Sequence, residues 1–223
     1  MKMVFPGINQ VFDCENGEEV WSLVIENQNL FYGILSDIRG QIEGIEGKVV
    51  LSEKNNLVSV AKTVELLIQF VPFEINQKQL ITKVISKLGQ IAVDEMHYGR
   101  TMELLGEIES YFTELAFELT GNIEFTKLGA EGLLKAAGVQ FCDDYEQLGE
   151  KIIDYMELVL EYDREKLFIF VNLRSYISDA QMKEFLETAL ARGYQMLLLE
   201  SCEHPLLPRE KRYIVDADLC EIW

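Results

Sequence analysis

Residues 166–201 read KLFIFVNLRSYISDAQMKEFLETALARGYQMLLLES, and this stretch decides the fold. Leu167 to Val171 form a continuous apolar run, which is typical of a strand covered on both faces. Ser178 can cap a helix in which apolar residues recur at three-to-four spacing until Gly193 ends it. Residues 194–199 repeat the apolar run. A strand, helix and strand of this length predict two neighbouring parallel strands, and therefore an α/β fold.

This arrangement is similar to the second half of a P-loop ATPase, although the residues that hold magnesium and phosphate are missing. Asn172 stands where such a strand ends in acids. The Gly-Lys pair at 47 and 48 is followed by Val49 instead of Ser or Thr, and Ile42 replaces the first Gly of the loop. We predict an ATPase-like parallel-sheet head with no P-loop, no nucleotide and no catalytic activity. Any other parallel α/β sheet would explain the periodicity equally well.

Composition limits the remaining possibilities. The 223 residues are 48% hydrophobic, which is enough for one core with a projecting element. No apolar run reaches the length of a membrane span, and the first residues lack the features of a signal peptide, so we expect a cytoplasmic protein with no membrane partner. The four cysteines are scattered without zinc or disulfide spacing, and we expect reduced thiols.

The formal net charge of −18 opposes attraction to nucleic acid by the surface as a whole. Such a charge does not forbid a local basic surface, because oligomerisation can gather a few bases from each subunit on one face or channel.

The rest of the head contains further predicted elements. We expect an opening strand with a turn over residues 2–14, a long helix over 18–38, a short strand at 49–51 and a central strand over 63–73. After the leg we expect a return to the sheet at 123–125, helices over 128–137 and 144–161, and a closing edge hairpin from 213–215 and 219–223.

Two amphipathic helices, over residues 80–92 and 102–119, are joined by a turn at His97. We predict that they form an antiparallel two-helix leg, residues 76–120, which projects from a head made of residues 1–75 and 121–223. The apolar stripe of each helix can cover its partner helix or contact a neighbouring subunit.

Several strings along the chain resemble the CRISPR-associated spacer-acquisition protein of type II-A systems, the small ring-forming member of the adaptation machinery. They are FVPFEIN at 70–76, TELAFE at 113–118, LLKAAGVQF at 133–141, EK at 150–151 and KLFIFVNLRSYIS at 166–178. The likeness runs from residue 66 onward, and most matching positions belong to the expected core.

This resemblance implies a non-catalytic homotetrameric ring whose central hole takes double-stranded DNA ends, acting with the CRISPR integrase complex and the RNA-guided nuclease. By position, Lys135 and Lys151 match DNA-facing lysines of the family, while Gln140 takes the place of a further lysine. Both lysines could equally be ordinary helix-surface residues. Phosphate neutralisation needs only charge and reach, which four copies around one hole would multiply.

The resemblance also implies calcium, which requires six to eight oxygen ligands. The candidate ligands near the junction of leg and head are Glu118, Glu124 and Glu131. Solvated surface acids are the alternative interpretation of these residues.

Two other functions compete with the DNA-binding ring. A working nucleotide hydrolase is favoured by the strand–helix–strand pattern and opposed by the missing phosphate loop. An acidic oligomeric scaffold that binds only protein is favoured by the net charge and by Gln140.

Overall fold

The computed structural model describes residues 1–15, 17–163 and 165–222. The chain divides into two compact units, which we call unit 1 (Met1–Glu74 and Asp144–Trp223) and unit 2 (Ile75–Asp143). This division differs from the boundary at residue 120 drawn from the sequence, because the short helix after that residue packs against the first long helix of unit 2.

Unit 1 is built on a six-stranded sheet in the order β10-β9-β3-β8-β7-β6. The strands are β3 (Val20–Ile25), β6 (Val64–Leu67), β7 (Leu167–Val171), β8 (Gln195–Glu200), β9 (Glu210–Val215) and β10 (Glu221–Ile222). The first five are joined by parallel pairings, and β10 runs antiparallel to β9. The α/β class is therefore confirmed, as is the closing edge hairpin over the residues described; Trp223 lies outside them.

The predicted crossover in residues 166–201 is confirmed. Strand β7 leads through a short 3-10 turn, η1 (Leu173–Ser175), into α7 (Asp179–Ala191) and then into β8, which pairs with β7 in parallel. Ser178 and Gln181 form a capping box at the start of α7, so two backbone N–H groups that the helix leaves unpaired are satisfied. Gly193 follows the helix with φ of 71°, a conformation that glycine adopts without strain.

Strand β3 shows that the prediction of one helix over residues 18–38 was wrong. All six β3 residues are buried, and the strand lies inside the sheet between β8 and β9. Helix α1 (Gln28–Ile42) begins only after Asn27, whose side chain accepts a hydrogen bond of 3.0 Å from the N–H of Leu30. A strand, a cap and a helix follow one another so closely that their apolar residues together imitate helical spacing.

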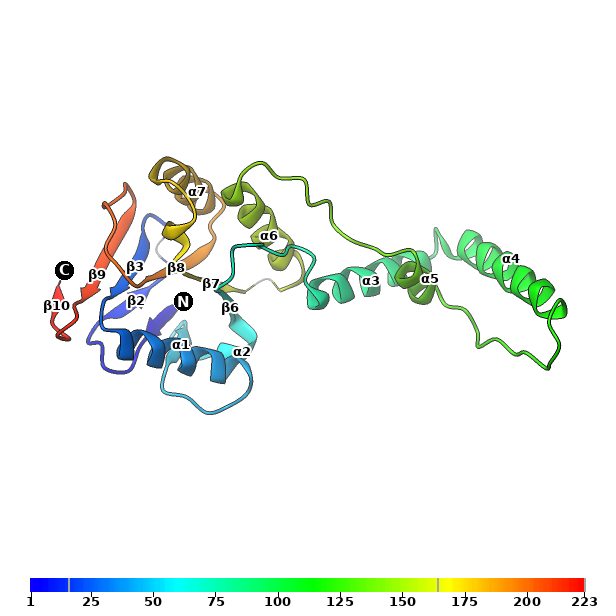
Figure 1. Cartoon of the computed structure of the whole chain (residues 1–223), viewed down its shortest axis with the longest axis horizontal. Coiled ribbons are helices and arrows are strands. Elements are labelled where there is room, and N and C mark those ends of the chain that lie inside the picture. Colours follow the sequence, from blue (N-terminus) through cyan, green and yellow to red (C-terminus); the bar gives the residue numbers. More distant parts are fainter. Residues whose placement is uncertain (16, 164, 223) are drawn as a thin grey trace. The chain divides into compact units, whose positions relative to one another are not determined.

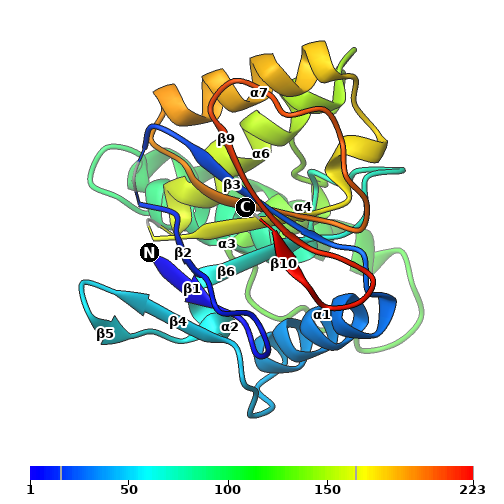
Figure 2. The same cartoon turned by 90° about the vertical axis from the view of Figure 1, so that its left-hand side faces the viewer.

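Layers cover both faces of the large sheet (Figure 2). Helix α6 (Leu148–Tyr162) and helix α7 lie over one face, where the rings of Phe170 and Phe185 pack edge to face with centroids 5.5 Å apart. Helix α1 and a second sheet lie over the other face. Burial on both faces explains the unbroken apolar runs of β7 and β8.

The second sheet is antiparallel, in the order β2-β1-β4-β5. It consists of β1 (Lys2–Val4), β2 (Val11–Asp13), β4 (Val50–Glu53) and β5 (Asn56–Leu57), and α2 (Val60–Thr63) follows it. The opening strand with a turn and the short strand near residue 50 are thus confirmed, and they pair with each other.

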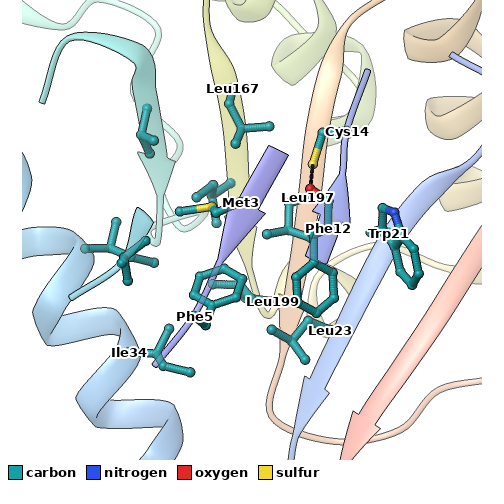
Figure 3. Packing of buried hydrophobic residues seen from close by; sticks show 14 of the residues in the cluster. Met3, Phe5, Phe12, Cys14, Trp21, Leu23, Ile34, Leu167, Leu197 and Leu199 are labelled. Atoms are coloured by element: carbon teal, nitrogen blue, oxygen red, sulfur yellow. Dashed lines mark hydrogen bonds between the residues drawn. The ribbon is translucent and has the colours of Figure 1, made fainter. Parts of the chain in front are cut away.

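The core of unit 1 lies between the two sheets and α1 (Figure 3). Phe12 of β2 contacts Phe5, Trp21 and Tyr213 with ring centroids 5.3–5.9 Å apart, so the small sheet packs directly on β3 and β9. Each large apolar side chain that is fully buried contributes about 1.5–3 kcal/mol.

Strand β6 is an edge strand, which corrects the prediction of a central strand over residues 63–73. Its only neighbour among the described strands is β7, and the regular strand ends at Leu67. Ile68 and Val71, which follow the strand, are 54% and 72% exposed, so these two apolar residues do not belong to the core.

Unit 2 contains α3 (Lys78–Ala92), α4 (Tyr98–Phe117) and α5 (Ala130–Ala136). The two long helices were predicted correctly, but α4 extends away from α3 and does not fold back along it (Figure 1). Helix α5 takes the place expected for α4, because it packs against α3 where Gly89 leaves room for Glu131. The predicted antiparallel hairpin is therefore not the arrangement seen.

The segment between α4 and α5 is not a strand, so the predicted return to the sheet at residues 123–125 was wrong. Phe125 packs instead on Phe112 of α4, with ring centroids 5.6 Å apart, and Glu109 of α4 accepts a hydrogen bond of 3.0 Å from the N–H of Leu128. In the described part of the chain, no helix is long and apolar enough to cross a membrane.

Candidate nucleic-acid interface

The Gly47-Lys48 segment is held in a way that differs from a phosphate-binding loop. It follows helix α1, whereas a P-loop precedes its helix. The carboxylate of Asp37 on α1 accepts hydrogen bonds of 2.7–3.0 Å from the N–H groups of Lys48 and Val49. A Cβ at Gly47 would collide with the side chains of Asp37 and Gln41, so a larger residue here would have to displace them. The N–H groups that could have met a phosphate are therefore bonded to a carboxylate.

A group of five charged residues, four of them largely buried, connects the end of β8 with the start of β9. We call it the strand-end cluster (Arg174, Asp179, Glu200, Glu210 and Arg212). Nη1 of Arg174 lies 3.1 Å from Oε2 of Glu210, and Nη2 lies 2.8 Å from Oδ1 of Asp179. Nη2 of Arg212 lies 3.4 Å from Oε1 of Glu210. Arg174 is thus shared between a strand and a helix that are far apart in sequence.

Glu200 is the most perturbed acid of the strand-end cluster. Its side chain is 1% exposed, and Oε1 accepts a long hydrogen bond of 3.3 Å from the N–H of Arg174. Oε2 accepts no hydrogen bond from the residues that the structure describes, and Nε2 of His204 lies 3.7 Å from it. Burial raises the pKa of Glu200 to about 7, against the opposing effect of Arg174. Burial, followed by the charge of Arg174, lowers the pKa of His204.

Sequence reasoning missed this cluster. It treated the ATPase-like acids as absent because Asn172 follows β7, but a carboxylate does end the neighbouring strand β8. The signal was the terminal Glu200 of an otherwise apolar run. Unlike the acids of an ATPase, this carboxylate lies beside Arg174 and His204 in a network of ion pairs.

The two predicted DNA-binding lysines lie in different units. Lys135 is exposed in the last turn of α5 in unit 2. Lys151 belongs to the first turn of α6 in unit 1, where it is half-buried and has an interaction partner. Gln140 is exposed in the segment between these helices. Lys135 therefore has the exposure that a phosphate contact needs, while Lys151 is more constrained.

The predicted calcium ligands do not converge. Glu118 is the residue that ends α4, Glu124 lies in the following segment beside Glu109, and Glu131 packs over Gly89 on α3. Across residues 1–15, 17–163 and 165–222, no group of three His, Cys, Asp or Glu residues could hold a metal ion. These carboxylates do not fit the six to eight oxygens that calcium takes, so we derive no role for the ion.

The meeting point of the three helices of unit 2 is an apolar cavity of about 270 Å³. Helix α3 contributes Leu88, Ile91 and Ala92, and α5 contributes Leu133 and Leu134. His97, predicted to lie at a turn, precedes α4 at the rim of this cavity and bonds to Asp94 at 2.8 Å. Beyond the cavity, large apolar side chains of α4 and the next segment stay exposed: Tyr111, Phe112, Leu115, Phe117 and Leu119.

Comparison with known proteins gives one informative result. A search among curated proteins found no match to the chain. A family model described as CRISPR-associated protein (Cas_Csn2) matches residues 41–219, a range that contains all of unit 2 and every strand from β4 to β9. The match confirms the resemblance inferred from the sequence. The chain belongs to the Cas_Csn2 family of CRISPR-associated proteins.

Proposed function

We propose that this protein is a non-catalytic, ring-forming protein that binds the ends of double-stranded DNA during CRISPR spacer acquisition. The observation that carries the proposal is the family match over residues 41–219, which assigns the protein to CRISPR adaptation and antiviral defence. In this role it would act beside the integrase complex and the RNA-guided nuclease.

Lys135 and Lys151 are the residues that we propose to contact phosphate. Lys135 is exposed at the end of α5, where a flexible ammonium group can follow a phosphate backbone. Contacts to phosphate carry no sequence information, so the protein would bind DNA of any sequence. A homotetramer would present four copies of each lysine.

The exposed apolar side chains of α4 support assembly. Phe117 is 83% exposed and Leu119 is 62% exposed, and both belong to the TELAFE region and the segment after it. Groups of exposed apolar residues are characteristic of protein interfaces. We propose that they are covered in the homotetramer.

The hydrogen bonds of Asp37 support a protein without nucleotide chemistry. They occupy the N–H groups of Lys48 and Val49, and a phosphate would have to displace a carboxylate to reach them. We therefore propose that the protein neither binds nor hydrolyses ATP.

An acidic scaffold that binds only protein is the alternative function. It is favoured by the net charge of −18 and by Gln140 in place of a lysine. It predicts the same oligomer but no affinity for DNA, so a binding measurement separates the two functions.

The experiment compares linear duplex DNA with relaxed circles of equal length, by fluorescence anisotropy and competition. We expect linear fragments to compete better than circles, because a closed ring can be threaded only from an end, and we expect affinity to fall as salt rises. Lys135→Glu combined with Lys151→Glu should abolish binding while light scattering still gives the wild-type mass. Lys54→Glu combined with Lys183→Glu, at two exposed lysines of unit 1, is the charge-matched control. Equal competition by circles, or unchanged affinity of the first variant at low salt, contradicts the proposal.

A further inference from the structure

Helix α3 has an unusual charge for this chain. Its 15 residues include Lys78, Lys83 and Lys87 and no Asp or Glu. Each of the other described helices longer than eight residues, α1, α4, α6 and α7, contains at least one acid. In a protein with a net charge of −18, a helix of this length without an acid is a local concentration of positive charge.

The lysines are not spread evenly around α3. Leu80, Val84, Ile85 and Gly89 are its buried residues. At about 100° per residue, the opposite side carries five polar residues, which we call the α3 polar face: Gln79, Lys83, Ser86, Lys87 and Gln90. Four of these five are exposed and Ser86 is half-buried. Lys83 and Lys87 lie one turn apart on this face, and Lys83 also has an interaction partner within the chain.

The chemistry of the α3 polar face suits phosphate better than protein. Lysine, glutamine and serine side chains are the usual donors to phosphate oxygens. Centres of protein interfaces are depleted in lysine and rich in aromatic residues, and this face has no apolar residue. A protein partner would therefore have no anchor here.

The α3 polar face also belongs to the same compact unit as Lys135. Helix α5 packs on α3, where a Cβ at Gly89 would lie 2.6 Å from Cγ of Glu131, and Lys135 follows Glu131 by one turn. Glu131 meets α3 on its buried side, not on the polar face. Helix α4 of this unit carries Glu103, Glu107, Glu109 and Glu114, which repel phosphate. Helix α5 carries one acid and one lysine, so the excess of positive charge in this pair of helices lies on α3.

We propose that the α3 polar face, with Lys83 and Lys87 as its cations, is a second phosphate-binding surface of unit 2 that extends the contact made by Lys135 along duplex DNA. This inference rests on the proposed DNA-binding function.

The test measures how the affinity of the full-length protein for a labelled linear duplex depends on salt. The variants are Lys87→Gln and the double variant Lys83→Gln with Lys87→Gln; glutamine keeps helix propensity. The matched control is Lys78→Gln, which removes the same charge from the same helix about 180° away from Lys87. We expect the slope of log affinity against log salt to become shallower by about 0.9 for each phosphate that Lys87→Gln no longer neutralises, and to stay unchanged in Lys78→Gln.

Three results would overturn the inference, and they have different meanings. If the wild-type protein binds linear DNA and neither polar-face variant alters the slope, the α3 polar face does not contact DNA, while the proposed function stands. If the variants change the mass of the oligomer and leave the slope intact, the face contacts an acidic surface of a neighbouring protein. If the wild-type protein does not bind linear DNA, the proposed function fails as well, and no variant is needed to show it.

Discussion

Replacing Glu200 by Gln should make the protein more stable at high pH and leave its stability unchanged at low pH. The carboxylate is almost completely buried at the end of β8, and its pKa is raised from 4.5 to about 7. The unfolded chain therefore releases this proton at a lower pH than the folded chain does. Stability attributable to Glu200 is fully present below about pH 4.5, declines as pH rises, and is lost once pH exceeds the folded pKa.

The size of this effect follows from the shift. Each unit of pKa corresponds to about 1.36 kcal/mol, so the rise to about 7 gives a loss of about 3 kcal/mol above pH 8. Glutamine has nearly the same shape and keeps an oxygen that can accept the N–H of Arg174. It carries no charge, so Glu200→Gln should exceed wild type by about 3 kcal/mol at pH 8 and equal it near pH 4.5.

Other charged groups lie near the carboxylate of Glu200. These are Arg174 from η1, Asp179 from α7, and Glu210 and Arg212 from β9. His204 acts in the opposite sense: its pKa is lowered, so the stability it contributes is present above about pH 6.5 and is lost as pH falls through the folded pKa. Both proteins contain His204, so its contribution largely cancels when the stability of Glu200→Gln is compared with that of the wild type.

The assay is urea denaturation of both proteins from pH 4.5 to pH 8 at one protein concentration, because association shifts apparent stability. Glu203→Gln is the matched control: this acid lies in the segment that follows β8, is 56% exposed and pairs with Arg212, so its loss should cost under about 1 kcal/mol at every pH. Wild-type and Glu200→Gln stabilities that run parallel across the whole range would refute the reasoning.

Three further predictions follow from particular contacts. Isothermal titration calorimetry with magnesium and ATP should show no binding, and stoichiometric binding would contradict the role given to Asp37. Gly47→Ala should lower the melting temperature, because its Cβ would collide with the side chains of Asp37 and Gln41. Gly33→Ala, in open space on α1, should instead raise the stability by up to about 1 kcal/mol; equal effects would refute the argument. In a thiol titration of the native protein at pH 8, Cys14 should stay unreactive, because burial raises its pKa to about 12. The exposed thiols should react, namely Cys142, Cys202 and Cys220. Equal reaction rates for all four cysteines would contradict this prediction.

The sequence predicted those elements whose signals are local. The β7–α7–β8 crossover has two unbroken apolar runs, a capping serine and a terminal glycine, and all four signals agree with the structure. The prediction for residues 18–38 was wrong because the apolar residues of strand β3 and helix α1 together show one apparent helical period. Asn27 was the available signal, since an asparagine that caps a helix cannot lie inside one.

Features that depend on tertiary pairing could not be predicted. The strand-end cluster brings together Glu200, the last residue of β8, and Glu210, the first residue of β9, because the N–H of Arg174 bonds to one acid and its guanidinium to the other. Nothing local to either residue indicates Arg174 as the shared partner. The position of α5 against α3 could not be predicted either, because it depends on the space left by Gly89 and not on the periodicity of α4.

The acid excess and a DNA-binding role are physically compatible. At physiological ionic strength the Debye length is about 8 Å, so an exposed acid farther than this from a phosphate contributes little repulsion. Affinity then depends on the charges within that distance of the DNA, and a helix with three lysines and no acid differs in sign from the chain as a whole. The distribution of the bases over α3 and α5, not the total of −18, is what decides whether a phosphate is attracted there.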